Sequence, residues 1–256
     1  MTTLLSVNVN KVATLRNQRD GDVPSVLGLA KVALDAGAHG ITVHPRPDER
    51  HIRAADCDAI ANEFANGHFR GEFNIEGNPL DFGGGHLMPI LRRIRPTQAT
   101  LVPDGPDVFT SNQGWDFRAQ ATELAEAIAR LHAVGARVVL FADPDPDAMA
   151  HAAATGADRV ELYTEPYAVT EPRSQQRSKQ LKRYRLTAIA ARDAGLGVNA
   201  GHDLNRENLV DFLAEVPNVE EVSIGHALIA DALALGLSET VRRYCEIVRG
   251  TRADSP

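Results

Sequence analysis

The nine residues AGAHGITVH at positions 36–44 decide the fold that we expect for this chain. A helical spacing of apolar residues over 24–36 ends at Gly37, a residue that can adopt the left-handed conformation found at helix ends. The apolar, β-branched run at 41–43 follows almost at once, as is typical of a buried strand. A helix, a glycine turn and a short buried strand in direct succession indicate an α/β protein.

The same plan of helix end, glycine and apolar strand recurs at Gly135, Gly156 and Gly195. Eight short strands are expected in all, at 4–8, 41–44, 73–76, 98–102, 137–141, 159–163, 197–200 and 219–224. Short strands separated by helices pair in parallel through right-handed crossovers. Eight such units in 256 residues predict an α/β fold, a (β/α)8 TIM barrel. A doubly wound open sheet is the alternative, weakened because no G-x-G-x-x-G motif follows the first strand.

We expect this barrel to form a single domain over 1–250 with extra helical segments, followed by a frayed tail at 251–256. Helices are expected at 24–36, 54–64, 87–94, 116–134, 145–154, 183–194, 205–214 and 227–248, the last one broken near Gly236. The polar segments at 8–19 and 164–182 are assigned no helix. The three glycines at 83–85 predict a flexible loop, with a phosphate cradle as the weaker alternative.

Composition argues against several classes of protein. The formal net charge is -7 with no long basic run, so nucleic acid is not an expected partner. Cys57 and Cys245 lie far apart and form neither a disulfide framework nor a zinc-ligand pattern, which fits a reducing cytoplasm. No apolar run approaches the roughly 18 residues of a membrane helix, and the N-terminus lacks the features of a signal peptide. We therefore expect a cytoplasmic protein without a membrane partner.

Ionisable side chains concentrate where the expected strands end, which is where barrels place their reactive groups. His44, His202 and His226 lie at or just after three of these ends, and Glu76 and Glu161 lie at the end or in the interior of two more strands. Imidazole titrates near neutrality and a buried carboxyl can have a raised pKa, so these residue types suit proton transfer. A packed histidine or an exposed turn acid is the structural alternative. Glu161 should face the barrel lumen, where it needs an ion-pair partner or a chemical role.

Arg46 and His51, which follow the second strand, suit an anionic substrate because guanidinium binds phosphate through two hydrogen bonds. The prolines at 45 and 47 end that strand at about residue 44. The alternative for Arg46 and His51 is a salt-bridged loop with Asp48 and Glu49.

The Gly-His pairs at 201–202 and 225–226 follow the seventh and eighth strands, the usual phosphate site of such barrels. Glycine lets an anion approach the backbone, and a helix N-terminus attracts negative charge. Asp203 and Asn205 also suit helix N-caps, so capping is the alternative role for Asp203.

These residues lead to a resemblance to the PdxJ family, the pyridoxine 5'-phosphate synthases of vitamin B6 biosynthesis. The matching stretches cover nearly the whole chain in order: VNVN (7–10), ATLRN (13–17), GITVH (40–44), RHI (50–52), NIE (74–76), LVP (101–103), VNAGH (198–202) and IGHA (224–227). Each motif is short, but all of them together are specific for this family.

The resemblance implies that the chain condenses two phosphorylated small molecules, 1-deoxy-D-xylulose 5-phosphate and 3-amino-2-oxopropyl phosphate. The implied products are pyridoxine 5'-phosphate, inorganic phosphate and water. No metal or organic cofactor is implied. Family members assemble as octamers, so a homo-oligomer is expected.

Residue roles also follow from the resemblance, position by position. It implies that His44 and Glu76 accept protons, that His202 donates one and that Glu161 stabilises charge in the transition state. The deoxyxylulose phosphate would be bound by Arg46, His51 and Thr110, with Asn10 and Lys11 beside it. The aminoketone phosphate would be bound by Asn8, Arg19, Asp203, Gly225 and His226.

The chain departs from the family pattern in three places. Asn10-Lys11 stands where the family often has Asp-His, which removes an acid and an imidazole, although lysine can still bind phosphate. Asp203 stands where some members have glycine, so a contact there is expected through the backbone. The segment 83–86 also differs, which predicts a shortened third helix or a longer loop before it.

Two other functions stay open. A metal-dependent barrel hydrolase would use His44, Glu76, His202 and His226, but the second strand ends in His-x-Arg rather than His-x-His, and Arg46 would repel a cation. A non-catalytic barrel would bind phosphorylated ligands without turnover.

Overall fold

The computed structural model describes residues 2–80, 85–105, 108 and 111–250. Its strands are β1 (Leu4–Asn8), β2 (Gly40–Val43), β3 (Glu72–Gly77), β4 (Gln98–Leu101), β5 (Arg137–Ala142), β6 (Arg159–Tyr163), β7 (Gly197–His202) and β8 (Val219–Ile224). They pair in parallel in sequence order, and β8 pairs with β1, so the sheet closes into a barrel. The predicted (β/α)8 barrel is confirmed, and the open doubly wound sheet is wrong.

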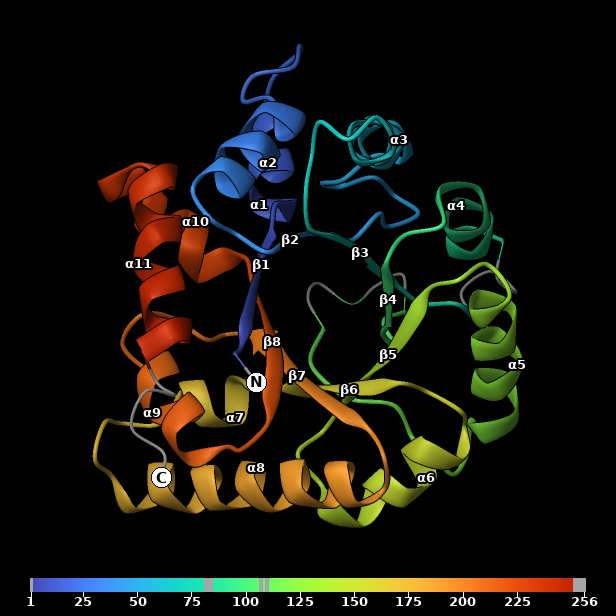
Figure 1. Ribbon diagram of the computed structural model, residues 1–256, viewed down its shortest axis with the longest axis vertical. Helices are drawn as coiled ribbons and strands as arrows, with labels where there is room; N and C mark the ends of the chain where they lie inside the picture. The colour runs from blue at the N-terminus through green and yellow to red at the C-terminus, as the bar shows by residue number, and fades with distance from the viewer. Residues whose placement is uncertain (1, 81–84, 106–107, 109–110, 251–256) are drawn as a thin grey trace.

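Helices form a ring outside the strands (Figure 1). They are α1 (Asn10–Arg16), α2 (Val26–Asp35), α3 (Ala54–Ala65), α4 (Leu87–Ile94), α5 (Ala121–His132), α6 (Met149–Ala154), α7 (Glu165–Ala168), α8 (Gln175–Asp193), α9 (Leu209–Glu215), α10 (His226–Leu235) and α11 (Leu237–Gly250), with a 3-10 turn at Pro146–Ala148. The main apolar core joins strands to helices: Ile41 and Val43 of β2 belong to the same buried cluster as Ala30 and Ala33 of α2. The sheet and its helices therefore bury their apolar faces against each other.

Three helices were not predicted or began earlier than predicted, and one of them, α7, lies in the polar segment 164–182. The segment 8–19 contains helix α1, and α8 begins at Gln175 rather than at residue 183. The Ser174 side chain accepts a hydrogen bond from the backbone N–H of Arg177 and so caps α8. Glutamine, lysine and arginine are good helix formers, but the first turns of α8 have too few apolar residues to give a periodic pattern.

Two other helices begin later than predicted because side chains form turns in front of them. The Asp116 carboxylate accepts hydrogen bonds from the N–H groups of Arg118 and Ala119, and α5 begins only at Ala121. Asn205 accepts from two N–H groups in the same way, so α9 begins at Leu209. The predicted break at Gly236, where φ is +79°, is confirmed.

Polar side chains fill the lumen where the strands begin. The members of this amino-terminal network are Glu72, Gln98, Arg137, Arg159, Asn199, Glu220 and Glu221. Arg137 pairs with Glu72, and Arg159 Nη2 lies 2.6 Å from Glu220 Oε2. Gln98 Nε2 donates to Glu221 Oε1 at 3.0 Å. Each carboxylate of the network therefore has a partner.

Within the residues described above, no helix is both long enough and apolar enough to cross a membrane. The predicted tail at 251–256 and most of the glycine loop, residues 83 and 84, lie outside those residues.

Candidate active site

A cavity of about 450 Å³ opens where the strands end. Its lining comes from most of the strands and the segments that follow them: Asn8, Asn10, Lys11, Thr14, His44, Arg46, Arg50, His51, Glu76, Ser111, Glu161, His202, Asp203, Ser223, Gly225 and His226. We call it the main cavity. Its position at the carboxyl ends of parallel strands is where barrels carry their reactive groups.

The four residues predicted to be catalytic all line the main cavity. His44 directly follows β2, Glu76 lies near the end of β3, Glu161 lies in the middle of β6 and His202 ends β7. Residues separated by up to 158 positions in the sequence thus meet because parallel strands end at one face of the barrel.

Eight of the ten residues predicted to bind substrate also line the main cavity: Asn8, Asn10, Lys11, Arg46, His51, Asp203, Gly225 and His226. Arg19 is exposed on the turn after α1 and is not among the lining residues. Thr110 lies outside the described residues.

Two buried carboxyl groups of the main cavity have raised pKa values, because few neighbouring groups stabilise their charged forms. Burial, followed by the charges of Asp104 and Glu221, raises the pKa of Glu76 to about 8, and Arg46 opposes this shift. The amide of Asn8 donates to Glu76 Oε2 at 3.3 Å. Burial, followed by the charges of Glu76 and Glu221, raises the pKa of Glu161 well above its ordinary value. Both groups are therefore able to carry a proton near neutral pH.

The structural ion pair that was the alternative role for Glu161 is absent from the part of the chain that the structure describes. Glu161 is 2% exposed, and its Oε2 has no hydrogen-bond partner there. A buried oxygen without a partner costs free energy, so a role in binding or chemistry is the better explanation for Glu161.

Three histidines of the main cavity, His44, His51 and His202, have lowered pKa values. Burial and then the charge of Arg46 lower the pKa of His44 well below its ordinary value, and the same two causes lower the pKa of His51 to about 4. Burial also lowers the pKa of His202, although the Asp203 carboxylate beside it opposes the shift. His202 has a φ of +77°, a conformation that is rare for residues other than glycine and that is often found at functional sites.

Polar side chains of β1 and the start of α1 fix the shape of the main cavity. Asn10 Oδ1 accepts a hydrogen bond from the backbone N–H of His44 at 2.9 Å, so Asn10 positions the end of β2. A Cβ at Gly225 would lie 3.1 Å from the side chain of Asn8, so a glycine fits closely at the start of α10. Gly225 and His226, at the N-terminus of α10, both line the main cavity.

The capping alternative for Asp203 is wrong. Asn205 supplies the side-chain acceptor of the turn before α9, and no hydrogen bond to the Asp203 carboxylate comes from a described residue. Burial instead raises the pKa of Asp203, which lines the main cavity.

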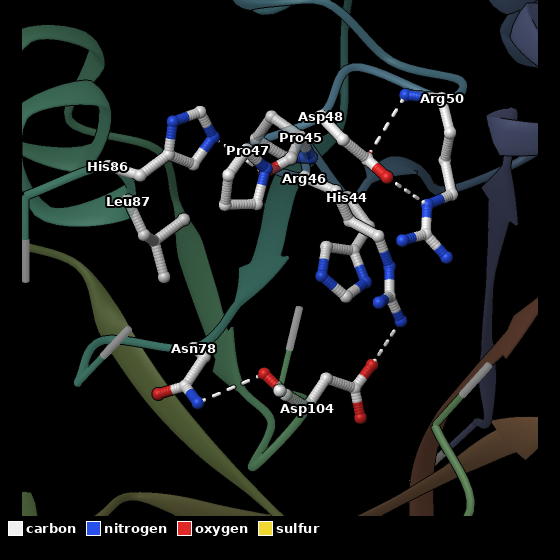
Figure 2. Close-up of a pocket in the computed structure, with 11 residues that line it drawn as sticks. His44, Pro45, Arg46, Pro47, Asp48, Arg50, Asn78, His86, Leu87 and Asp104 are labelled. Atoms are coloured by element: carbon white, nitrogen blue, oxygen red, sulfur yellow. Dashed lines mark hydrogen bonds and ion pairs between the residues drawn. The ribbon is translucent and has the colours of Figure 1, made fainter. Parts of the chain in front are cut away.

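The alternative of a salt-bridged loop is confirmed in part, because Asp48 forms a salt bridge in this loop, but its partner is not Arg46. Arg46 pairs with Asp104, which follows β4, while Arg50 pairs with Asp48. Figure 2 shows these residues around a second, smaller cavity of about 230 Å³, which shares His44, Arg46 and Arg50 with the main one. We call it the side cavity.

Sequence reasoning missed four residues that line the main cavity: Thr14, Arg50, Ser111 and Ser223. Arg50 lies in the quoted RHI motif and Ser223 lies one residue from the end of β8, so position alone could have suggested both. Thr14 lies in the quoted ATLRN motif, which could have suggested it as well, whereas Ser111 lies in a long loop and carries no such signal.

No group of three or more His, Cys, Asp or Glu side chains in the described ranges is arranged to bind a metal ion.

Comparisons with known proteins identify the family. The model of the PdxJ family, described as pyridoxal phosphate biosynthesis protein PdxJ, matches residues 5–250. A pyridoxine 5'-phosphate synthase from Albidiferax ferrireducens is 54% identical over 99% of this chain and 100% of its own length. One from Porphyromonas gingivalis is 51% identical over 94% of this chain and 97% of its own.

Solved structures with low sequence identity share the fold alone. A tryptophan synthase from M. tuberculosis has a TM-score of 0.63 at 16% identity, covering 97% of this chain and 93% of that one. A thiamine phosphate pyrophosphorylase from Pyrococcus furiosus has a TM-score of 0.59 at 11% identity, covering 98% of both chains.

Proposed function

The chain belongs to the PdxJ family of pyridoxal phosphate biosynthesis proteins, and we propose that it is a pyridoxine 5'-phosphate synthase. In this reaction 1-deoxy-D-xylulose 5-phosphate condenses with 3-amino-2-oxopropyl phosphate to give pyridoxine 5'-phosphate, inorganic phosphate and water. Relatives that carry this name are 51–54% identical to the chain over almost its whole length. The chain is accordingly an enzyme of vitamin B6 biosynthesis.

The convergence of four acid–base side chains on one cavity supports this reaction most directly. An amine must attack a ketone, protons must move, phosphate must leave and a ring must close with loss of water. Such a sequence needs several proton-transfer groups and two anion sites in one enclosed volume. The main cavity supplies candidates for all of them.

For the deoxyxylulose phosphate we assign Arg46, His51 and Thr110, with Asn10 and Lys11 beside them. For the aminoketone phosphate we assign Asn8, Arg19, Asp203, Gly225 and His226. The N-terminus of α10 at Gly225 favours a phosphate, because its free N–H groups and positive dipole end attract an anion. The roles of Arg19 and Thr110 rest on the family resemblance alone.

His44 and Glu76 are the proposed proton acceptors. The low pKa of His44 leaves a free lone pair on the imidazole at neutral pH. Glu76, with a pKa of about 8, holds a proton in the free enzyme. A cationic amine entering the site would lower the pKa of Glu76, so this carboxylate would form when the substrate that needs a base arrives.

His202 is the proposed proton donor, and Glu161 would stabilise positive charge as it develops. Two phosphate dianions in the main cavity would raise the pKa of His202 and offset the effect of its burial. Glu161 is buried, and one of its oxygens has no partner among the described residues, so it would gain one when a cationic intermediate forms.

The test is to supply the two phosphorylated substrates to the purified enzyme and to measure pyridoxine 5'-phosphate and released inorganic phosphate. We expect equal amounts of both products to accumulate. Binding of the substrates without turnover would contradict the proposal and favour a non-catalytic phosphate-binding barrel.

We also propose that the enzyme works in the cytoplasm as a homo-octamer, as the family resemblance implies. Light scattering should then give a mass eight times that of the 27.6 kDa chain. A monomer at micromolar concentration would contradict the assembly.

A further inference from the structure

Arg46, which we assign to the deoxyxylulose phosphate, is already bound to an anion of the protein itself. Its Nη2 donates to Asp104 Oδ2 at 2.5 Å, and its Nη1 donates to the carbonyl oxygen of Val108 at 2.6 Å. Figure 2 shows the Asp104 carboxylate directed at the guanidinium of Arg46. Both residues are 5% exposed, so water screens this pair poorly.

Asp104 is held in this position by groups on its own loop and on β3's continuation. Ser111 Oγ donates to Asp104 Oδ2 at 2.6 Å, the same oxygen that Arg46 uses. The side-chain amide of Asn78 donates to the backbone oxygen of Asp104 at 3.1 Å. The Asp104 carboxylate therefore occupies a built anion position on Arg46.

A substrate phosphate bound to Arg46 would share the guanidinium group with this carboxylate. Arg46 and Ser111 line the main cavity, where the substrate would bind, whereas Asp104 lines the side cavity behind Arg46. A phosphate dianion on Arg46 would place three negative charges around one guanidinium in a poorly screened site. Like charges at such distances repel strongly, so the phosphate and the carboxylate compete for Arg46.

We propose that Asp104 is an internal anion that binds Arg46 in the free enzyme, is displaced when the substrate phosphate binds and so lowers the affinity of the site for phosphate. This inference rests on the proposed function, because it takes Arg46 as a phosphate ligand. The side cavity gives the displaced carboxylate room beside Asn78 and His86.

The direct test is Asp104→Asn, which keeps the shape and the acceptor for Arg46 and Ser111 but removes the charge. Calorimetry with inorganic phosphate at about pH 8, where phosphate is mostly a dianion, measures the dissociation constant. We expect binding at Arg46 to become about tenfold tighter, as loss of one poorly screened repulsion requires. Unchanged or weaker binding would overturn the proposal, because a carboxylate that merely positions Arg46 would weaken binding when neutralised.

Two further variants make this result specific. Asp48→Asn removes the same charge from the lining of the side cavity, but Asp48 is 50% exposed and paired with Arg50, so we expect a change of less than about twofold. Ser111→Ala removes a donor that holds Asp104 and should tighten phosphate binding by a smaller factor than Asp104→Asn. This second variant tests the competition even if Asp104→Asn does not fold, and a weaker affinity would count against it.

Arg46→Met separates failure of this inference from failure of the proposed site. If Arg46→Met loses phosphate binding and Asp104→Asn does not tighten it, Arg46 binds phosphate but the competition is refuted. If Arg46→Met binds phosphate as the parent enzyme does, the assignment of Arg46 fails, and the inference fails with it.

Discussion

The two ends of the barrel lumen contain the same kinds of side chains but pair them differently. At the amino-terminal end, Glu72 pairs with Arg137, and Glu220 pairs with Arg159. At the carboxyl end, Glu76 has one amide donor at 3.3 Å among the described residues, and one oxygen of Glu161 has no partner among them. Polar residues of the lumen therefore do not by themselves identify the active site, whereas the two carboxyl groups with few partners among the described residues both line the main cavity.

The difference between the two ends of the lumen has a physical reason. A paired carboxylate contributes to stability because its charge is compensated. A ligand therefore gains little binding free energy by contacting it. An unpaired carboxylate is costly in the free enzyme, and a ligand that supplies the missing partner recovers that cost. We expect variants at the carboxyl end to lower the activity and variants at the amino-terminal end to lower the stability.

The largest effect is expected at the carboxyl end with His44→Ala and His202→Ala. Both variants should fold, because neither side chain belongs to the apolar core, and both should lose about 10²–10⁴-fold in the rate of pyridoxine 5'-phosphate formation. His132→Ala, which removes an exposed partner of Asp158, is the matched control and should keep its activity. Full activity in either cavity variant would remove that histidine from the catalytic residues.

The next effect is the pH dependence of stability, measured by urea unfolding of the parent enzyme and Glu76→Gln. The pKa of Glu76 is raised from 4.5 to about 8, so the stability that its protonated form provides is complete below about pH 4.5. This contribution is lost as pH rises from about 4.5 to about 8, because ionisation of a buried carboxyl is unfavourable in the folded state. The parent should lose of the order of 3–5 kcal/mol relative to Glu76→Gln over this range. Parallel curves for the two proteins would show that the pKa of Glu76 is not raised.

The smallest effect is expected at the amino-terminal end with Arg137→Met. This change removes the partner of Glu72 and a donor to Gln98, so the free energy of unfolding should fall by about 1–3 kcal/mol. Activity should stay within about twofold of the parent value, since Arg137 does not line the main cavity. Arg93→Met, which breaks an exposed pair with Asp58, is the control and should cost less than about 1 kcal/mol. A large loss of activity in Arg137→Met would break the distinction between the two ends.

Much of the fold could be predicted from the sequence because local chemistry marks it. Glycines at helix ends and short β-branched runs located the strands, and Gly236 located the break between α10 and α11. The start of α8 at Gln175 could not be predicted from periodicity, because its first turns are polar. The late starts of α5 and α9 depend on single side-chain turns at Asp116 and Asn205, which compete with helix formation.

The candidate site could be predicted only as far as strand ends determine it. His44 and His202 were found because parallel strands end at one face of the barrel. The pair of Arg46 and Asp104 joins residues 58 positions apart through a loop whose path the sequence does not define. Nearby acids such as Asp48 consequently looked like better partners for Arg46 than the acid that it contacts.

The most direct test compares the turnover of Glu76→Gln and Glu72→Gln, two changes of the same chemistry at opposite ends of one strand. We predict that Glu76→Gln loses at least about 10²-fold in turnover while Glu72→Gln stays within about twofold of the parent enzyme. Equal losses in the two variants, or full turnover in Glu76→Gln, would contradict the claim that the reaction takes place in the main cavity, at the carboxyl-terminal end of the barrel strands.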